Sequence, residues 1–215
     1  MCTQPSDGHF VTKQGTPISL HWHLARTISA SDEAQMKEVF VDAFCAAYRA
    51  SNAHTDKTDS EIQDYLAGDF DKILHPNLHS EKPQIFLAAK ASGKMAGYSL
   101  FEMLDARTAY IAELAIAPLF WNQGLGKKLT FAIVELNPGI EKIVLVTERI
   151  NKVSQAFYER IGFRSSEYEH EGYPRERFCA YEIDVQGGMH GRPARQRQRL
   201  ATAFSRSANL SRIRS

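Results

Sequence analysis

One stretch of the sequence decides the fold: AYIAELAIAPLFWNQGLGKK, at positions 109–128. Its first half, Ala109 to Pro118, is apolar on both faces apart from Glu113, as expected of a strand in the centre of a sheet. Two glycines one residue apart, Gly124 and Gly126, then open a helix with a periodic apolar stripe. This order predicts an anion site, because unpaired amides and the positive end of the helix dipole converge there.

The turn at 122–127 suits a pyrophosphate group. Gly124 and Gly126 carry no Cβ that would hold such a ligand away from the backbone, and Lys127 and Lys128 add positive charge. An ordinary glycine turn before a packing helix is the alternative interpretation. The stretch is neither a dinucleotide fingerprint nor a P-loop, since it lacks the third glycine of the first and the Gly-Lys-Ser/Thr ending of the second.

Strand and helix patterns alternate on both sides of this stretch. Strands are expected at 18–24, 84–90, 95–104, 108–117, 141–147, 163–169 and 177–185, and helices from the cap Ser31 to 49 and at 60–74, 124–136 and 151–161. The three strands between 84 and 117 are joined by short turns, which predicts an antiparallel meander. The whole order predicts an α/β protein with a mixed sheet.

Composition limits the class of protein. The chain has 215 residues, of which 43% are hydrophobic and 24% charged, enough for one substantial core and at most two domains. No apolar run reaches the length of about 18 residues that a membrane-spanning helix needs, and positions 1–15 are too polar for a signal peptide. Three scattered cysteines, Cys2, Cys45 and Cys179, are typical of reduced thiols. We therefore expect a soluble, cytoplasmic protein.

Charge is unevenly distributed along the chain. The net charge is +1, but seven arginines and no acid lie within 186–215, so residues 1–185 hold 19 basic and 25 acidic side chains. We expect a polar extension at 1–15, a folded domain at 16–185 and a flexible, Arg-rich tail at 186–215. The tail is either a solvated extension or an arm that contacts nucleic acid or an acidic partner. As a further alternative, it binds the acidic body of the chain, where it would inhibit the protein itself or bridge two copies in a homodimer.

Two motifs resemble the GNAT superfamily of acyl-CoA N-acyltransferases. The first is LAIAP at 114–118 followed by QGLG at 123–126, and the second is NKVSQAFYERIGF at 151–163. The resemblance spans about residues 18–185 and implies a GNAT-like fold, with a mostly antiparallel central sheet, a splayed strand pair and helices on both faces. The sequence departs from the family at Trp121, where Arg or Gln is usual, and Lys127 or Lys128 would have to replace that phosphate contact.

The resemblance implies an N-acetyltransferase that moves an acetyl group from acetyl-CoA to a primary amine by direct attack in a ternary complex. Acetyl-CoA would lie in a gap between the strands at 108–117 and 141–147. The pantetheine arm would pair with residues 114–116, the pyrophosphate would lie on residues 122–127, and Asn151 would lie beside the donor. The implied binding residues are Leu114, Ala115, Ile116, Asn122, Gln123, Gly124, Leu125, Gly126, Lys127 and Asn151.

Two residues are candidates for proton transfer. Tyr158 matches the general acid of the family, which protonates the leaving CoA thiolate. Its own spacing, taken without the resemblance, favours a half-buried tyrosine beside an apolar helix stripe. Glu113 is the single charged side chain of an apolar strand, so burial should raise its pKa toward that of a working base. A structural carboxylate is the alternative for Glu113, and Glu148 is the reserve base.

The acceptor amine is left open among a protein or peptide amine, a polyamine-like metabolite and an aminoglycoside-like drug. Tyr168, Glu171, Tyr173 and the acidic helix at 59–71 are candidates to shape its site. His21 and His23 share a strand face without a third ligand nearby in the sequence, so no metal is expected. The alternative function is a non-catalytic acyl-CoA sensor or adaptor that acts through its basic tail, or a nucleic-acid-binding protein.

Overall fold

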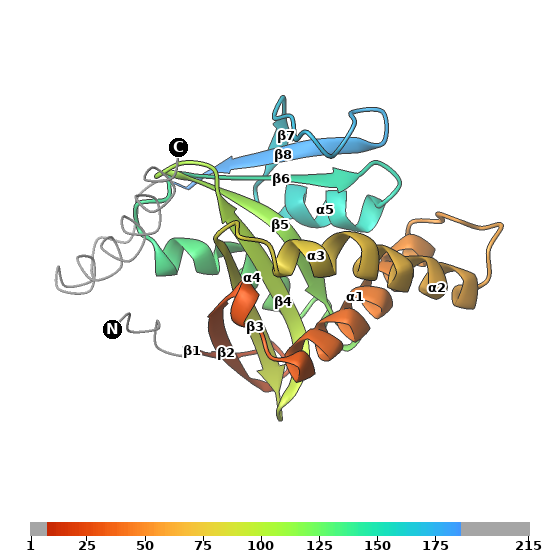
Figure 1. Ribbon diagram of the computed structural model, residues 1–215, viewed down its shortest axis with the longest axis horizontal. Coiled ribbons are helices and arrows are strands. Elements are labelled where there is room, and N and C mark those ends of the chain that lie inside the picture. Colours follow the sequence, from red (N-terminus) through yellow and green to blue (C-terminus); the bar gives the residue numbers. More distant parts are fainter. Residues whose placement is uncertain (1–7, 186–215) are drawn as a thin grey trace.

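Within residues 8–185, eight strands form one mixed sheet in the order β1-β2-β3-β4-β5-β6-β8-β7 (Figure 1). The computed structural model describes residues 8–185. The strands are β1 Gly8–Val11, β2 Pro17–Leu24, β3 Gln84–Ala91, β4 Lys94–Met103, β5 Thr108–Ile116, β6 Lys142–Glu148, β7 Arg164–Ser166 and β8 Phe178–Asp184. Only β5 and β6 pair in parallel, and the other neighbours are antiparallel. The expected mixed sheet and antiparallel meander are confirmed.

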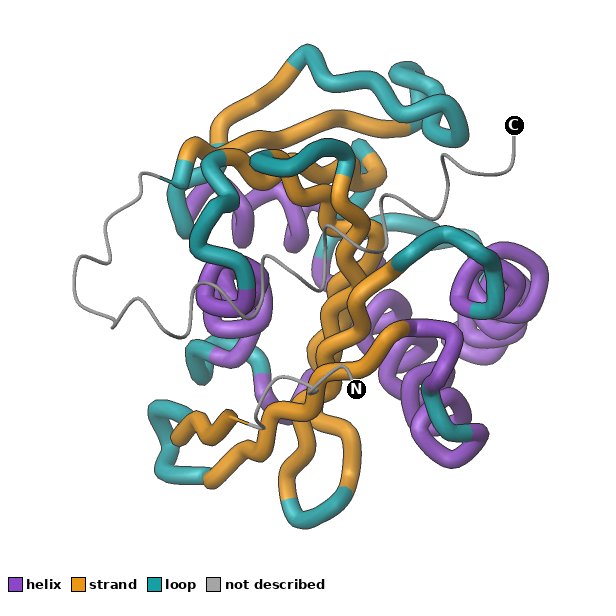
Figure 2. The backbone as a smooth tube through the Cα atoms, turned by 60° about the vertical axis from the view of Figure 1, so that its left-hand side comes forward, coloured by secondary structure: helices purple, strands orange, loops and turns teal. Residues whose placement is uncertain are grey.

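Helices cover both faces of this sheet, as Figure 2 shows with the sheet seen nearly edge-on. They are α1 Ala30–Ala50, α2 Asp59–Asp69, α3 His75–Leu78, α4 Leu125–Leu136 and α5 Lys152–Arg160, with short turns η1 Ala25–Thr27, η2 Phe70–Leu74 and η3 Pro118–Phe120. Apolar side chains of α1, α2 and α3 pack on one face, and those of α4 and α5 pack on the other. The expected arrangement of helices is therefore confirmed.

Helix α1 begins earlier than expected. Its N-cap is Ser29, whose side chain accepts a hydrogen bond of 3.1 Å from the amide of Asp32, so the expected cap at Ser31 is wrong. Both serines precede acidic residues, and the extended backbone of Ser29 makes it the last residue outside the helix. The acidic first turn, Asp32 and Glu33, lies at the positive end of the helix dipole as expected.

The single helix expected at 60–74 is instead a continuous series of α2, a π-helical turn and α3. The buried residues of this series recur every four positions: Ile62, Leu66, Phe70, Leu74 and Leu78. Four residues of an α-helix turn through about 400°, so a strict spacing of four drifts by about 40° at each step. The wider π turn at η2 offsets this drift and keeps Leu74 and Leu78 on the core side.

The N-terminal residues described do more than the expected polar extension would. Strand β1 pairs with β2, and the Lys13 amide donates a hydrogen bond of 3.1 Å to the carbonyl of Gln123. Strand β7 is shorter than expected, at three residues. Cys45 and Cys179 are free thiols, whereas Cys2 and the Arg-rich tail, with its expected partners, lie outside the described residues. No helix within residues 8–185 has both the length and the apolar character to cross a membrane.

Candidate active site

Strands β5 and β6 part halfway along their length. They pair in parallel from Thr108, opposite Lys142, to Ile111, opposite Leu145, and the ladder ends there. On the other side of β5 the register with β4 slips at the same point, because Leu100 lies opposite Glu113 while Phe101 lies opposite Ile111. Ala112 is thus the extra residue of a β-bulge, which bends β5 away from β6. The expected splayed strand pair is present, and the region beyond Ile111 and Leu145, where the two strands no longer pair, is called the gap below.

Backbone groups of β5 face this gap. The amide of Ala117 bonds the carbonyl of Ala96 at 3.0 Å, and antiparallel pairing alternates, so Ala115 also points toward β4 while Leu114 and Ile116 point toward the gap. The Ile116 carbonyl accepts a hydrogen bond of 2.6 Å from the indole of Trp121. The Leu114 carbonyl and the Ile116 amide therefore lie on the side of β5 where pairing with β6 has already ended at Ile111.

Glu113 lies beside the gap on the α1 face of the sheet. It is opposite Leu100, which belongs to the same core cluster as α1, and residues opposite each other share a face. Burial raises the pKa of Glu113 to about 8, and the negative charge of Glu148 adds to the rise. A hydrogen bond of 3.2 Å from the Leu114 amide lowers the pKa and offsets part of this rise. Glu113 forms no ion pair with any described residue.

Glu148, at the end of β6, is held differently. Arg177 donates to its Oε1 through Nε at 2.9 Å and Nη2 at 2.6 Å, and the hydroxyl of Tyr48 from α1 donates to its Oε2. The Glu148 side chain is 11% exposed. Its lone pairs are therefore engaged by a cation and a phenol, whereas those of Glu113 meet a single amide.

Tyr158 lies on the opposite face, in α5. Its ring packs against Phe163 and Tyr181, with centroids 5.4 Å and 6.4 Å away, and its hydroxyl has no hydrogen-bond partner among the described residues. Burial, followed by the negative charge of Glu113, raises the pKa of the Tyr158 phenol above its usual range. The phenol is thus protonated at neutral pH, and the charge of Glu113 interacts with it across the gap.

The turn before α4 presents backbone amides. Gly124 is the N-cap with φ of +91°, a conformation that favours glycine, and no side chain caps the helix. The first-turn amides of Leu125, Gly126 and Lys127 consequently have no acceptor among residues 8–185. The ring of Phe10 from β1 packs on this turn, 3.5 Å from where a Cβ of Gly124 would lie. The first-turn amides thus form the end that an anion would approach.

Side chains around this turn support its shape. Gln123 is buried and donates from Nε2 to the Leu119 carbonyl at 2.6 Å, and Trp121 closes the turn through its bond to Ile116. The Asn122 backbone has φ of +59°, in the left-handed region. Lys128 pairs with Glu135 at 2.7 Å, so the charge expected to replace a phosphate contact is already neutralised there. Lys127 is exposed and has no ion pair with a described residue.

The Asn151 side chain caps helix α5. It is buried, and its Oδ1 accepts a hydrogen bond of 3.0 Å from the Ser154 amide as the N-cap of α5. Its own amide donates to the Glu148 carbonyl at 3.0 Å. Asn151 therefore fixes the start of the helix that carries Tyr158 relative to the end of β6.

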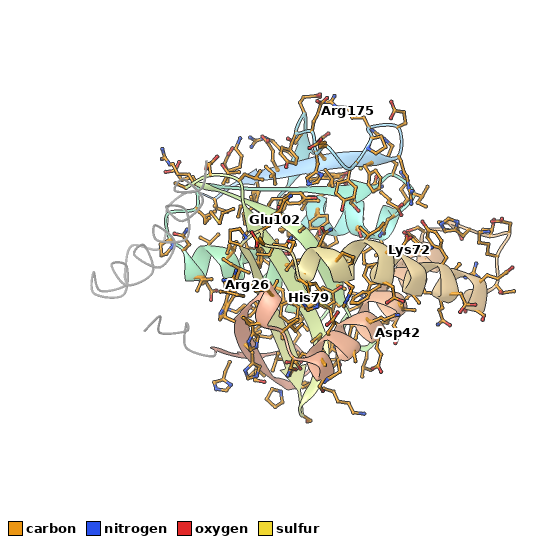
Figure 3. The ribbon with its side chains drawn as sticks, in the orientation of Figure 1. Arg26, Asp42, Lys72, His79, Glu102 and Arg175 are labelled. Carbon is orange, nitrogen blue, oxygen red and sulfur yellow. The ribbon has the colours of Figure 1, made fainter. Side chains whose placement is uncertain are left out.

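A cluster of aromatic side chains lies on the same face as Glu113. Tyr110 stacks on His170 with centroids 5.0 Å apart and contacts Tyr168 at 5.9 Å, while His170 contacts Tyr173 at 4.7 Å. Glu102 of β4 is opposite Tyr110, and Figure 3 labels its position. Burial raises the pKa of Tyr173 to about 12, with smaller contributions from the negative charges of Glu113 and then Glu102.

Sequence reasoning found part of this aromatic cluster. Tyr168 and Tyr173 were expected near the acceptor, whereas Glu171 is exposed and belongs to none of the ring contacts. Tyr110 and His170 were missed, because a tyrosine in an apolar strand and a histidine in a loop give no periodic signal. A separate surface hollow of about 380 Å³, lined by Asp105, Arg107, Thr108, Glu141, Lys142 and Asp184, lies at the far end of the β5–β6 pair. It is not part of this site.

Comparison with known proteins agrees with the geometry. Residues 40–163 match the acetyltransferase (GNAT) family model. N-alpha-acetyltransferase 30 of Schizosaccharomyces pombe is 46% identical over 56 residues, which are 25% of this chain and 37% of that protein. The chain thus matches little more than a third of that relative's length.

Solved structures share the fold at low sequence identity. PaiA N-acetyltransferase from Thermoplasma acidophilum, in complex with coenzyme A, has a TM-score of 0.58 at 18% identity, covering 77% of this chain and 99% of that one. An acetyltransferase from Thermus thermophilus has a TM-score of 0.53 at 16% identity, covering 77% and 97%. Because the family model covers more than half of the sequence, the chain belongs to the GNAT family of acetyltransferases, which use acyl-CoA.

Proposed function

We propose that this protein transfers an acetyl group from acetyl-CoA to a primary amine by direct attack in a ternary complex. The observation that carries the proposal is the parting of β5 and β6 at Ala112, which leaves backbone hydrogen-bonding groups and Glu113 beside one gap. The donor would enter from the side of α4 and α5, and the amine from the side of α1. The two substrates would then meet between the strands.

The donor side uses backbone groups. The Leu114 carbonyl is placed to accept from an amide of the pantetheine arm, and the Ile116 amide is placed to donate to a pantetheine carbonyl or to the thioester carbonyl. The backbone of Ala115 pairs with β4, so Ala115 contributes only its small side chain. The turn of Asn122, Gln123 and Gly124 holds the first-turn amides of Leu125, Gly126 and Lys127 toward the pyrophosphate, and Lys127 adds the charge that Lys128 no longer supplies. Asn151 acts by fixing α5.

The reaction needs proton transfers at the amine nitrogen and at the leaving sulfur. An alkylammonium of pKa about 10.4 must lose a proton before it can attack, which costs about 4 to 5 kcal/mol at pH 7 without a base. In our proposal Glu113 takes this proton, directly or through a water. The amine nitrogen then bonds to the thioester carbon, the nitrogen releases its second proton to solvent, and the C–S bond breaks as the tetrahedral intermediate collapses. Tyr158 gives its phenolic proton to the departing thiolate and regains one from solvent.

Glu113 is a better candidate for the base than Glu148. A base must have a lone pair available and a pKa near the working pH. Glu113 accepts one long amide hydrogen bond and has a pKa of about 8, whereas Glu148 is engaged by Arg177 and Tyr48. In this scheme Glu148 acts indirectly, since its negative charge helps to keep the pKa of Glu113 high.

The acceptor side supports a cationic substrate. The rings of Tyr110, Tyr168 and Tyr173 and the carboxylate of Glu102 lie on the face of Glu113, and aromatic faces attract ammonium groups. The acidic helix contributes less than expected, because Asp59 pairs with Arg49 and Asp71 pairs with Lys37. The partial match to an N-alpha-acetyltransferase adds peptide α-amines to the acceptors that should be tested.

The experiment measures CoA thiol released from acetyl-CoA by the full chain across a panel of amines. The panel holds peptides with a free N-terminus, N-terminally blocked lysine peptides, a polyamine and an aminoglycoside, and mass spectrometry checks the acetylated product. Amine-dependent thiol release supports the proposal. Binding of acetyl-CoA without release from any amine would instead support the sensor or adaptor. No heat and no stabilisation with millimolar acetyl-CoA would overturn both.

A further inference from the structure

Three side chains of the kind that bind metals lie together outside the active site. Glu33 is in the first turn of α1, and His75 begins α3. His79, which Figure 3 labels, directly follows α3. One oxygen of Glu33 and one ring nitrogen of each histidine all lie within 4.8 Å of one another. Nδ1 of His75 is hydrogen-bonded to Glu33, and Nε2 of His79 is 3.2 Å from Oε2 of Glu33.

The packing of the helices brings these groups together. His75 and His79 are four residues apart and share one helix face. Lys37, one turn after Glu33, pairs with Asp71, one turn before His75, at 2.6 Å, so the two segments run antiparallel side by side. Leu74 and Leu78 are buried beneath them in the same cluster as Met36 of α1. The position of the three groups is therefore set by a packed core.

The charges around Glu33 favour a cation. Its side chain is 16% exposed, and within residues 8–185 its ion-pair partners are the two histidines, with no lysine or arginine. The neighbouring cations are used elsewhere, since Lys37 pairs with Asp71 and Lys90 pairs with Asp32 at 2.5 Å. The histidine side chains are 51% and 42% exposed, so an ion can reach them.

We propose that Glu33, His75 and His79 bind a zinc ion that fastens α3 to α1. Two imidazole nitrogens and one carboxylate oxygen form a set of three protein ligands that leaves the fourth tetrahedral position to water. Ligand atoms about 2.1 Å from a tetrahedral ion lie about 3.4 Å apart, close to the 3.2 Å between His79 and Glu33. Imidazole ligands select zinc and its neighbours over magnesium or calcium.

Sequence reasoning missed this site because its ligands come from distant segments. Glu33 precedes His75 by 42 residues, and the histidine pair alone is too common a spacing to indicate a metal. The inference does not rest on acetyl transfer, and its test needs no acetyl-CoA.

The test uses the full chain after treatment with a chelator. Cobalt(II) is titrated while its visible absorption is followed, since four-coordinate cobalt absorbs far more strongly than the hydrated ion, and zinc is then added as a competitor. We expect one ion per chain and a zinc-dependent rise in Tm of about 5 °C or more at saturating zinc. The variant H75Q/H79Q should bind at least about tenfold more weakly and lose the rise in Tm.

Two further variants make the test decisive. Glu33→Gln removes the carboxylate without touching the histidines and should also weaken binding, so it decides the matter if H75Q/H79Q does not fold. His9→Gln, which changes an exposed histidine outside the cluster, should bind as the wild type does. Failure of the wild type to bind zinc, or equal cobalt spectra and Tm shifts in wild type and in the folded variants of the cluster, would overturn the proposal.

Discussion

Replacing Glu113 by glutamine should change the pH dependence of the reaction. With a pKa of about 8, the Glu113 carboxyl is ionised in about 1% of molecules at pH 6 and in about half at pH 8. If the ionised form is the base, kcat/KM should rise about tenfold per pH unit below pH 7 and level off above pH 8.5. The acceptor for this experiment should be an alkylamine of pKa about 10.4, which stays protonated throughout this range.

The variant E113Q should lose the bend near pH 8. Without the base, only the small neutral fraction of the amine reacts, so log kcat/KM should keep rising toward the pKa of the amine. At pH 8 the loss should be about a hundredfold to ten-thousandfold, the range found for general base catalysis. Initial rates of thiol release from pH 6 to pH 9.5, at saturating acetyl-CoA, give this profile.

A matched carboxylate separates this effect from a general change of charge. Glu141 lies before β6, at the end of the β5–β6 pair far from the gap, and pairs with Arg107. The variant E141Q should keep the bend near pH 8 and the rate of the wild type. A profile for E113Q that still bends near pH 8 would refute the assignment of Glu113 as the base.

Three further changes test other parts of the site. The variant E148Q removes a negative charge that raises the pKa of Glu113, so the bend in the same pH profile should move to lower pH; an unmoved bend would contradict this coupling. Tyr158→Phe should lower kcat several-fold or more. The dissociation constant for acetyl-CoA and the Tm should stay nearly unchanged, because the ring contacts with Phe163 and Tyr181 remain. Turnover of the variant at the wild-type rate would exclude the role of Tyr158 as general acid. Gly124→Ala places a side chain at φ of +91°, which should lower the free energy of unfolding measured in urea by about 1 to 2 kcal/mol and weaken acetyl-CoA binding. The control Gly68→Ala, inside α2, should leave acetyl-CoA binding unchanged.

Much of the fold could be predicted from local patterns. The strands at 84–117 and the helix at 125–136 differ clearly in period, so their type and order follow from the sequence. Boundaries were less certain because neighbouring residues offer similar signals, as Ser29 and Ser31 do for the cap of α1. Strand β1 was missed because its four residues are too few for a pattern, and its partner β2 supplies the pairing that stabilises it.

Candidate site residues could be named from the sequence where one segment carries the signal. Glu113 stands out in its apolar strand, and its raised pKa agrees with the expectation from burial. The contacts of Glu148 with Tyr48, 100 residues earlier, and with Arg177, 29 residues later, join segments that no local pattern connects. The sequence favoured Glu113 because of its apolar strand and kept Glu148 in reserve, whereas the contacts of Glu148 add a reason that only the structure supplies.

The bulge at Ala112 links the shape of the sheet to the position of Glu113, the proposed base. Side chains alternate along a strand, so Tyr110 and Glu113, three residues apart, would point to opposite faces of a regular β5. The extra residue restores Glu113 to the face of Tyr110, opposite Leu100 and beside α1. The same residue ends the pairing of β5 with β6 and opens the gap. A regular strand would keep both β5 and β6 paired and place the carboxylate against α4 and α5, away from the aromatic cluster that an amine would meet first.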